Sequence, residues 1–398
     1  MAATPPLLLL LLALLRGAAA QDPQWAPLGA PIFRVGLLTA SLSFDDGASV
    51  NDDGVPAFPA GTPLVAVGAG ADTRIDLLRF NGTAWSLFAS HTPAFSQTYA
   101  DFSFDFARGR AFVGLAITSD GALASVLRSG DAGSDGRFEG CWAFAADAFD
   151  YAVNGDGDLR VVAAAGGNAT LSTYNHSGYA SYPAADAFGP LTLLPAAADG
   201  SATTAVSVAT DGGGRDVLVA ALASAAAVRV VATTLSTVAS APPRVVDVGS
   251  PLVTGAAVSV AVAVGGGAVC TALVTDGALR VLCVDEGAGG AAAWTDLGRP
   301  AASDAATGTP TVARTGARGV VVAAARADAD GVDVLTALCQ LPPGAVGACV
   351  GGWRAAAVTA AASQVLGVDV RAFGADGTTE KVCLAVRDGG GVRVFQLA

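Results

Sequence analysis

The side chains that could carry out chemistry in this chain are mainly aspartates, because histidine and glutamate are rare. His occurs only at positions 91 and 176, and Glu only at 139, 286 and 380. Two Asp side chains could act as acid and base in glycoside hydrolysis, but Asp occupies so many turns that the sequence selects no pair. No G-x-S-x-G motif accompanies the two His, so a Ser-His-Asp set has no candidate. We therefore assign no catalytic residue. Whether the chain is an enzyme stays open, and we favour a protein without catalytic activity.

One segment is a weak candidate for a metal site. Asn154, Asp156 and Asp158 have the spacing of the calcium loop of FG-GAP-type propellers, which the segment resembles. Calcium needs about six to eight oxygen ligands, and the flanking ligand positions hold Ala152 and Arg160. Asp and Asn also cap plain turns through their own side chains. We favour a plain turn and expect no cofactor, with calcium as the alternative.

Three Asn-X-Ser/Thr triplets could accept N-linked glycans if the chain is secreted. They begin at Asn81, Asn168 and Asn175, each at or beside a predicted turn, where an acceptor must lie. The sequence therefore predicts a glycoprotein.

The five tryptophans mark an internal repeat. Trp25, Trp85 and Trp142 are spaced 57 to 60 residues apart, as are Trp294 and Trp353, and the gap between the two groups fits about three units. Periods of this size indicate repeat architectures. Seven units of about 54 residues fill the chain after its first 20 residues.

Each unit holds four short apolar runs separated by Gly and Asp turns. In the first run a small or polar residue alternates with apolar ones, as in 41–44, 206–208 and 368–370, which is the period of a strand. The second run is continuously apolar, the third alternates again, and the Trp segment is the fourth. We predict an all-β, seven-bladed β-propeller with four antiparallel strands per blade. The chain begins with a fourth-strand segment at 23–28 and ends in a third strand at 391–397, so the N-terminal strand is expected to close the last blade.

A family resemblance follows from the Trp segments. Residues 25–31 (WAPLGAP) and 294–300 (WTDLGRP) resemble the W-x-x-L/V-G-x-P repeats of secreted propellers, and 80–85 (FNGTAW) resembles the turn before the Trp in those repeats. Kelch and galactose-oxidase-like propellers are similar more distantly. The resemblance implies the fold and an extracellular setting, and it implies no activity.

The six cysteines predict two disulfide bonds: Cys270 with Cys283, and Cys339 with Cys349. The first pair flanks Asp276-Gly277, a strong two-residue hairpin turn, which places the two residues directly opposite with Cβ atoms within ~5 Å. The second pair flanks a Pro-Pro-Gly turn. Cys141 and Cys383 fall in units that do not touch, so we expect buried free thiols there.

The N-terminus is typical of a secretory signal. An apolar run at 7–15 is followed by small residues at 18–20, which favours a signal peptide over 1–20 and a mature propeller domain over 21–398. The run is too short for a membrane span of ~20 residues. An uncleaved anchor is the alternative, because residues 1–6 contain no Lys or Arg.

The charge narrows the class of partner. The net charge is −12 and the pI about 4.5, and an acidic surface repels nucleic acid and anionic lipid heads. We expect a secreted, extracellular monomer whose partner is an extracellular protein or a glycan, with no nucleic acid and no membrane after signal cleavage.

The function that fits these features is a binding or interaction module. Its expected site is the mouth of the central channel, where loops of all blades converge. A glycan-binding or glycoside-hydrolysing propeller using the same mouth is the alternative, with the tryptophans as sugar platforms. We favour instead that these rings cover the gaps between neighbouring blades, because aromatic burial is reason enough for the repeat.

Overall fold

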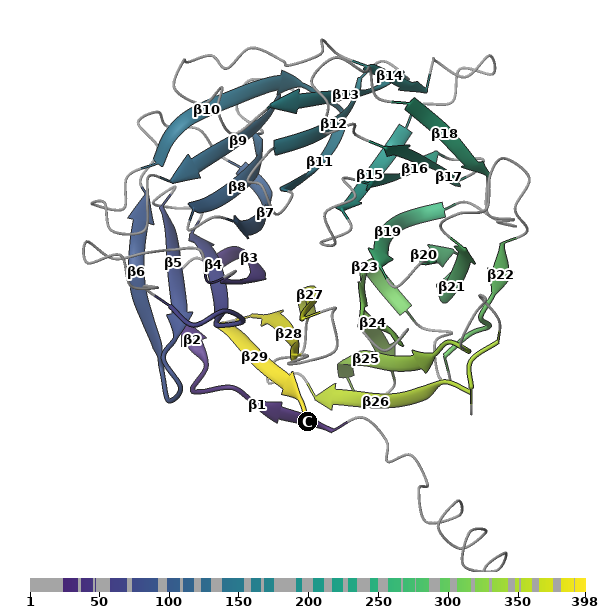
Figure 1. Ribbon diagram of the computed structural model, residues 1–398. Helices are drawn as coiled ribbons and strands as arrows, with labels where there is room; N and C mark the ends of the chain where they lie inside the picture. The colour runs from purple at the N-terminus through teal and green to yellow at the C-terminus, as the bar shows by residue number, and fades with distance from the viewer. Residues whose placement is uncertain are drawn as a thin grey trace, which may run out of the picture.

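A computed structural model of the chain has β-strands as its only regular elements within the residues it describes. These are 24–34, 37–45, 47, 58–69, 74–91, 99–107, 110–117, 123–129, 138–153, 159–165, 168–174, 191–194, 203–210, 217–224, 228–234, 244–249, 257–265, 268–275, 277–285, 294–300, 306–315, 319–328, 331–342, 348–350, 352–359, 365–374, 381–389 and 391–398. Their sheets stand around a central space, as in a propeller (Figure 1). No helix in this part of the chain is long and apolar enough to cross a membrane.

Each sheet is antiparallel, and most consist of four strands that are consecutive in sequence. The first three such sheets along the chain are β3 (Leu37–Phe44), β4 (Pro63–Ala69), β5 (Ile75–Phe80) and β6 (Trp85–His91); β7 (Tyr99–Ala107), β8 (Arg110–Ile117), β9 (Leu123–Ser129) and β10 (Phe138–Ala145); and β11 (Ala148–Val153), β12 (Leu159–Ala165), β13 (Asn168–Tyr174) and β14 (Leu191–Leu194). The first strand of each sheet lies nearest the central space (Figure 1).

The same plan continues through the second half of the chain. The next three sheets are β15 (Thr203–Thr210), β16 (Val217–Ser224), β17 (Val228–Thr234) and β18 (Arg244–Gly249); β19 (Ala257–Gly265), β20 (Ala268–Thr275), β21 (Ala278–Asp285) and β22 (Thr295–Asp296); and β23 (Ala306–Arg314), β24 (Gly319–Asp328), β25 (Gly331–Gln340) and β26 (Arg354–Thr359). The last sheet joins the two ends of the chain and holds β27 (Val365–Phe373), β28 (Lys381–Asp388), β29 (Gly391–Leu397), β1 (Trp25–Pro27) and β2 (Ile32–Phe33).

The last sheet corrects the predicted fold class. The expectation of seven blades with four antiparallel strands in each is wrong, because within the described residues six sheets have four strands and the closing sheet has five. The N-terminal segment pairs with β29 twice, placing Trp25 opposite Leu397 and Ile32 opposite Val392. Gly29, at a φ of 74°, lies in the bend that interrupts the segment. An L-residue rarely adopts that backbone conformation.

The N-terminal strand closes the ring as the Trp register predicts. Besides the ladder to β29, the Ala398 amide donates to the Gln24 carbonyl and the Leu28 amide to the Val394 carbonyl. The first and last described residues are therefore bonded to each other, and the sheet carries no open junction between chain ends.

Small apolar side chains fill the space between neighbouring sheets. All eight residues of β20 are buried, and Ala261, Ala263 and Ala272 pack in one cluster with Val320 and Val322 of the following sheet. Ala and Val bury little area each, about 0.8 kcal/mol per methylene, so the sheets lie close and many such contacts add up. Burial on both faces explains why the second run is continuously apolar at β20.

Candidate functional site

The innermost strands are joined to one another by side chains that accept backbone N–H groups of the next sheet. Ser41 Oγ of β3 accepts from the Phe104 amide of β7 at 3.1 Å. Ser207 Oγ of β15 accepts from the Val262 amide of β19 at 3.1 Å. These side chains are the polar residues that alternate in the first run of each unit. Their repeat is therefore explained by joining neighbouring sheets.

Hydroxyl groups also join the inner strands β19, β23 and β27 to one another. Thr311 Oγ1 of β23 accepts from the Val370 amide of β27 at 3.2 Å. Between β19 and β23 the direction is reversed, because Ser259 Oγ donates to the Gly308 carbonyl at 2.9 Å.

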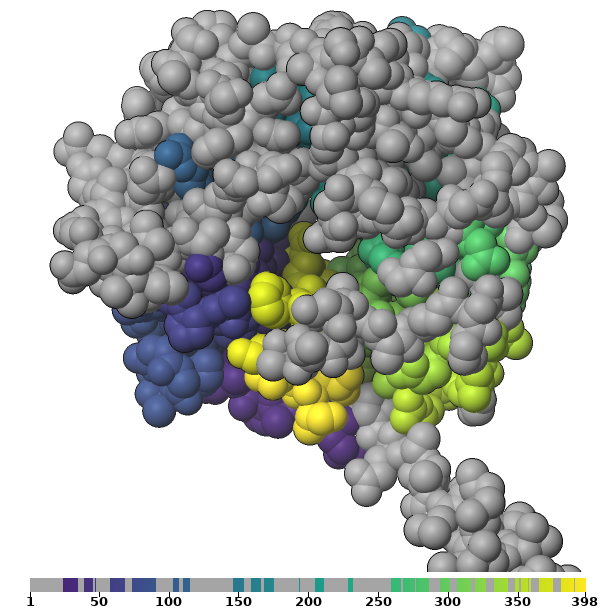
Figure 2. Space-filling model, viewed as in Figure 1, coloured from purple at the N-terminus to yellow at the C-terminus, as the bar shows by residue number. Residues whose placement is uncertain are grey.

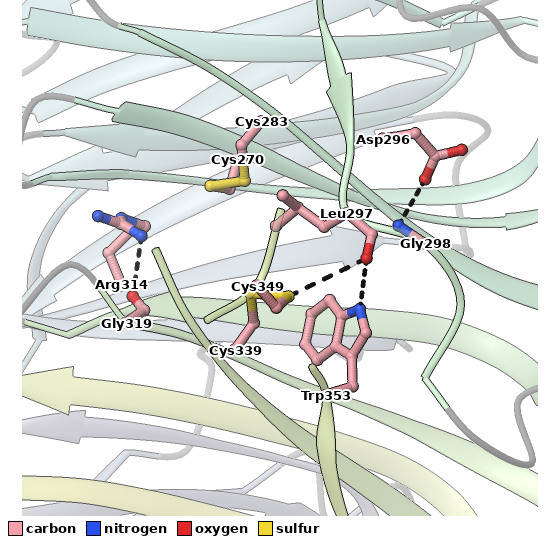
Figure 3. Close-up of a disulfide and its surroundings, with 10 residues drawn as sticks. All are labelled: Cys270, Cys283, Asp296, Leu297, Gly298, Arg314, Gly319, Cys339, Cys349 and Trp353. Atoms are coloured by element: carbon pink, nitrogen blue, oxygen red, sulfur yellow. Dashed lines mark hydrogen bonds between the residues drawn. A yellow bond between two sulfur atoms is a disulfide. The ribbon is translucent and has the colours of Figure 1, made fainter. Parts of the chain in front are cut away.

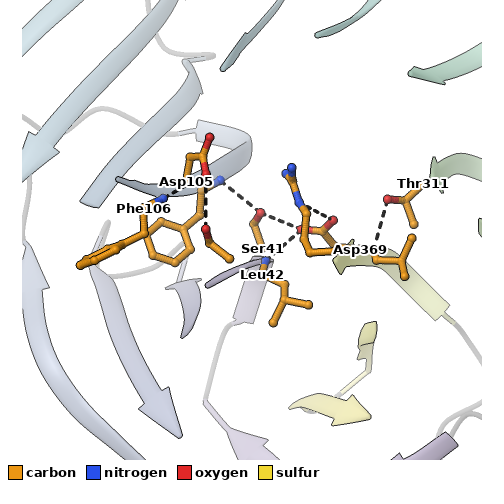
Figure 4. A network of polar contacts seen from close by, with 10 residues as sticks. Ser41, Leu42, Asp105, Phe106, Thr311 and Asp369 are labelled. Atoms are coloured by element: carbon orange, nitrogen blue, oxygen red, sulfur yellow. Dashed lines mark hydrogen bonds and ion pairs between the residues drawn. The ribbon is translucent and has the colours of Figure 1, made fainter. Parts of the chain in front are cut away.

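At the junctions of β27 with β3 and of β11 with β15, a carboxylate accepts the backbone amide instead of a hydroxyl. Asp369 Oδ2 of β27 accepts from the Leu42 amide and from Ser41 Oγ of β3, both at 2.9 Å (Figure 4). Asp150 Oδ2 of β11 accepts from the Val208 amide of β15 at 2.8 Å. Each bond again joins an inner strand to its neighbour, but with a charged acceptor.

Asp105 of β7 makes the third acidic junction. Its Oδ2 accepts from the Val153 amide of β11 at 3.4 Å, and its Oδ1 from Ser43 Oγ of β3 at 3.3 Å. One carboxylate thereby bonds to the sheets on both sides of its own.

A single arginine lies among these carboxylates in the described part of the ring. Arg371 of β27 places its Nε 3.2 Å from Asp369 Oδ1, and its side chain is 43% exposed. Figure 2 shows an opening near the centre of the ring. Because Arg371 lies on an inner strand and has this exposure, the wall here is charged and reachable by water.

The surroundings shift the proton affinities of these groups. Burial raises the pKa of Asp150 to about 6, against the opposing effect of N–H bonds from Val208 and Tyr151. Burial also raises the pKa of Asp105, although Arg371 opposes the rise. The charge of Asp369 holds the pKa of Arg371 above its ordinary value. The wall therefore combines a fixed cation with carboxyl groups that take up protons readily.

Tyr151 makes this part of the wall rigid. Its hydroxyl donates to the Phe112 carbonyl at 2.7 Å, and burial raises its pKa well above the usual value. Gly114 is required beneath the ring, since a Cβ there would lie 2.5 Å from Tyr151 Cε1. The tyrosine is thus fixed against the neighbouring sheet rather than free to move into the opening.

The outer strands carry a second kind of junction, made by tryptophans. Trp85 Nε1 donates to the Leu28 carbonyl at 2.9 Å, and Trp353 Nε1 donates to the Leu297 carbonyl at 2.8 Å (Figure 3). Each accepting Leu belongs to the W-x-x-L segment of the preceding sheet, so the motif supplies the acceptor for the next unit's Trp.

Trp25 joins the closing sheet to the one before it, because its Nε1 donates to Thr336 Oγ1 of β25 at 2.7 Å. The interpretation of these rings as covers between blades is supported for Trp25, Trp85 and Trp353. Trp294 is partly buried against the core between its sheet and the preceding one, and the side chain of Trp142 lies outside the described residues. Because these three rings are bonded to neighbouring sheets, they do not support the alternative in which the tryptophans stack on sugars.

Both predicted disulfide bonds are confirmed. Cys270 and Cys283 face each other across β20 and β21, with Cα atoms 4.2 Å apart, and Cys339 is bonded to Cys349 (Figure 3). Cys383 is free and buried as predicted, and burial raises its pKa to about 12. The side chain of Cys141 lies outside the described residues. Two disulfides are consistent with an extracellular protein, since cytosolic thiols stay reduced.

The remaining predicted site residues form no cluster within the described part of the chain. Asn81 and Asn168 are exposed at separate turns, while Asn175 and the calcium candidates Asn154, Asp156 and Asp158 lie outside the described residues, as do 1–20. No group of three or more metal-binding side chains occurs among the residues described.

The charged wall was missed by sequence reasoning. Asp150 and Asp369 stand at the point of the first run that Ser41 and Ser207 hold in their own units. Asp105 and Arg371 lie two residues further along, after Ser103 and Asp369 respectively. That departure from the repeat is the one signal that could have found them.

Comparisons with known proteins agree with this geometry only at the level of fold. No family model matches the chain, and no curated protein matches it. A solved structure described as "Structure of Dos1 propeller" is similar, with 12% sequence identity, a TM-score of 0.50, and coverage of 93% of this chain and 95% of that one. The fold is a β-propeller. At this identity the likeness carries the fold alone.

Proposed function

We propose that this chain is a secreted interaction module that binds an extracellular protein at the charged inner wall of the ring. The observation that carries the proposal is the break in the inner repeat. In place of a hydroxyl or beside one, the inner strands β7, β11 and β27 place Asp105, Asp150 and Asp369, and β27 also carries Arg371. A junction between sheets needs only an acceptor, which Ser207 and Thr311 supply, so the added charge has no structural necessity.

The charge of this wall favours a basic group on the partner. Three carboxylates are set against one guanidinium, and the carboxyls whose pKa values are raised by burial would lose their protons when a cation approaches. The net charge of the whole chain, −12, has the same sign as the charge of this wall. A Lys or Arg side chain of a partner loop would meet complementary charge both during approach and at the wall.

The compartment in this proposal is supported by several features together. They are the apolar segment at 7–15 with its small-residue cleavage site, the two disulfides and the W-x-x-L/V-G-x-P resemblance. We propose membership of that repeat type because its Leu and Trp have matching roles at two junctions.

Peptide binding to the mature protein tests the proposal. A short Lys/Arg-rich peptide and a Glu/Asp-rich peptide of equal length serve as probes, with binding followed by fluorescence anisotropy. We expect only the basic peptide to bind, more weakly as salt rises, and about tenfold more weakly to the Asp105→Asn/Asp150→Asn double variant. Ser207→Ala is the matched control, because it alters an inner junction without altering charge. Equal binding of both peptides, or none, contradicts the proposal.

A glycan-directed function is the second candidate, and one observation favours it. Asp150, with a pKa of about 6, could hold a proton near neutral pH, as a general acid of a glycosidase must. A panel of glycosides assayed with wild type and Asp150→Asn decides this. Turnover that is lost in Asp150→Asn supports a hydrolase, and the absence of both turnover and glycan-array signal removes it.

A further inference from the structure

The turn between β5 and β6 presents a complete Asn-Gly-Thr triplet to solvent. Asn81, Gly82, Thr83 and Ala84 are all exposed. Gly82 has a φ of 98°, and a Cβ built on it would meet no atom within 4 Å. The Asn81 amide donates to the Ala84 carbonyl at 3.0 Å, which closes the turn directly beyond the last ladder pair, Phe80 with Trp85.

The side chain of Asn81 holds this turn with its oxygen alone. Oδ1 accepts from the Thr83 amide at 3.1 Å, from Thr83 Oγ1 at 3.0 Å and from the Ala84 amide at 2.9 Å. No described residue accepts a bond from Nδ2. A substituent on that nitrogen would therefore displace no contact within the described structure, and it would extend into open space.

The triplet that begins at Asn168 is placed differently. Asn168 is the first residue of β13, opposite Ala165 of β12. Ala169 is fully buried, and Thr170 is half-buried in the ladder, with its hydroxyl donating to the Ala163 carbonyl at 3.5 Å. Its Asn is exposed, but the two residues that must accompany it are built into the sheet.

We propose that Asn81 is an N-glycosylation site and that the folded turn retains the glycan at the outer rim of the ring. In the transfer, Nδ2 attacks the anomeric carbon of an oligosaccharide carried on a lipid diphosphate. The new C–N bond replaces the C–O bond to the diphosphate, which leaves with the electron pair, and Nδ2 gives up one proton. This inference rests on the secretory part of the proposed function.

Expression in a secretory host that glycosylates tests the site. The secreted protein is digested with a peptide-N-glycosidase in heavy-oxygen water, which leaves a labelled Asp wherever a glycan was attached, and the peptide containing residue 81 is examined by mass spectrometry. We expect the label at position 81. We expect it to be lost in Asn81→Asp and Thr83→Ala, and to persist in Thr83→Ser.

The variants separate loss of the acceptor from loss of the turn. Asn81→Asp keeps the oxygen that accepts all three bonds and removes only the nitrogen, so folding is preserved. Asn168→Asp is the matched control and leaves the label at 81 unchanged. A secreted protein with an unlabelled residue 81 overturns this inference and leaves the compartment standing, whereas failure of the wild type to enter the secretory pathway overturns both.

Discussion

The two sides of the inner ring are built with different chemistry. From β15 to β23 the junctions use the hydroxyls of Ser207, Ser259 and Thr311, and the two sheets that end this side each contain a disulfide. From β27 through β3 and β7 to β11 the junctions use carboxylates, and between β3 and β7 the Ser41 hydroxyl adds a further bond. Both sides form the same strands at the same places, so the backbone arrangement does not depend on charge at the wall. The charged side chains of the acidic side are therefore not required by the fold alone.

The largest effect is expected from the covalent reinforcement of the hydroxyl side. Replacing Cys270 and Cys283 together by Ala should lower the free energy of unfolding by about 3 kcal/mol, because the bond restrains the unfolded chain across a separation of 13 residues. Urea unfolding followed by Trp fluorescence measures this. The Cys339→Ala/Cys349→Ala variant, with a separation of 10, is the comparison and should lose a similar amount. A negligible loss in both would show that the disulfides do not stabilise this side.

The acidic side should be most sensitive at Asp369. Asp369→Ala removes the acceptor of a buried amide and a buried hydroxyl and leaves Arg371 without its nearest anion. We expect a loss of about 2 kcal/mol in the free energy of unfolding, reduced from the value of a fully buried pair because the Arg371 side chain is 43% exposed. Asp369→Asn, which keeps one acceptor oxygen, should lose less. An equal loss in both variants would contradict the role given to the acceptor.

Local patterns predicted the elements of both sides but not the wall. The turn at Asp276-Gly277 was enough to place Cys270 opposite Cys283, because a two-residue hairpin fixes which residues face each other. Alternation in the first runs likewise identified the inner strands. Which side chain meets which amide depends on how neighbouring sheets are rotated, and the approach of Arg371 to Asp105 joins units far apart in sequence. No short-range pattern contains that information, and the five-stranded closure was missed because Pro31 and Gly29 hide the short β2.

The pH dependence of stability should distinguish the two sides. Asp150 binds its proton more tightly in the folded chain, with a pKa of about 6 against an ordinary 3.8. Its stabilising contribution is therefore complete below about pH 3.8 and is lost as the pH rises through 6. Between pH 4 and 7 the wild type should lose about 1 to 2 kcal/mol that Asp150→Asn does not lose, after allowance for solvent at the wall. Urea midpoints across this range measure it, with Ser207→Ala expected to keep the wild-type slope.

The smallest effect concerns single hydroxyls and asks whether the polar repeat itself stabilises the ring. Ser207→Ala leaves the Val262 amide without its acceptor and should lower the free energy of unfolding by about 1 kcal/mol. Thr309 of β23 is exposed to solvent, so Thr309→Ala should change stability by less than about 0.5 kcal/mol. Equal losses of stability in the two variants would show that the Ser207 hydroxyl does not stabilise the junction. The carboxylates could then no longer be interpreted as replacing a stabilising hydroxyl.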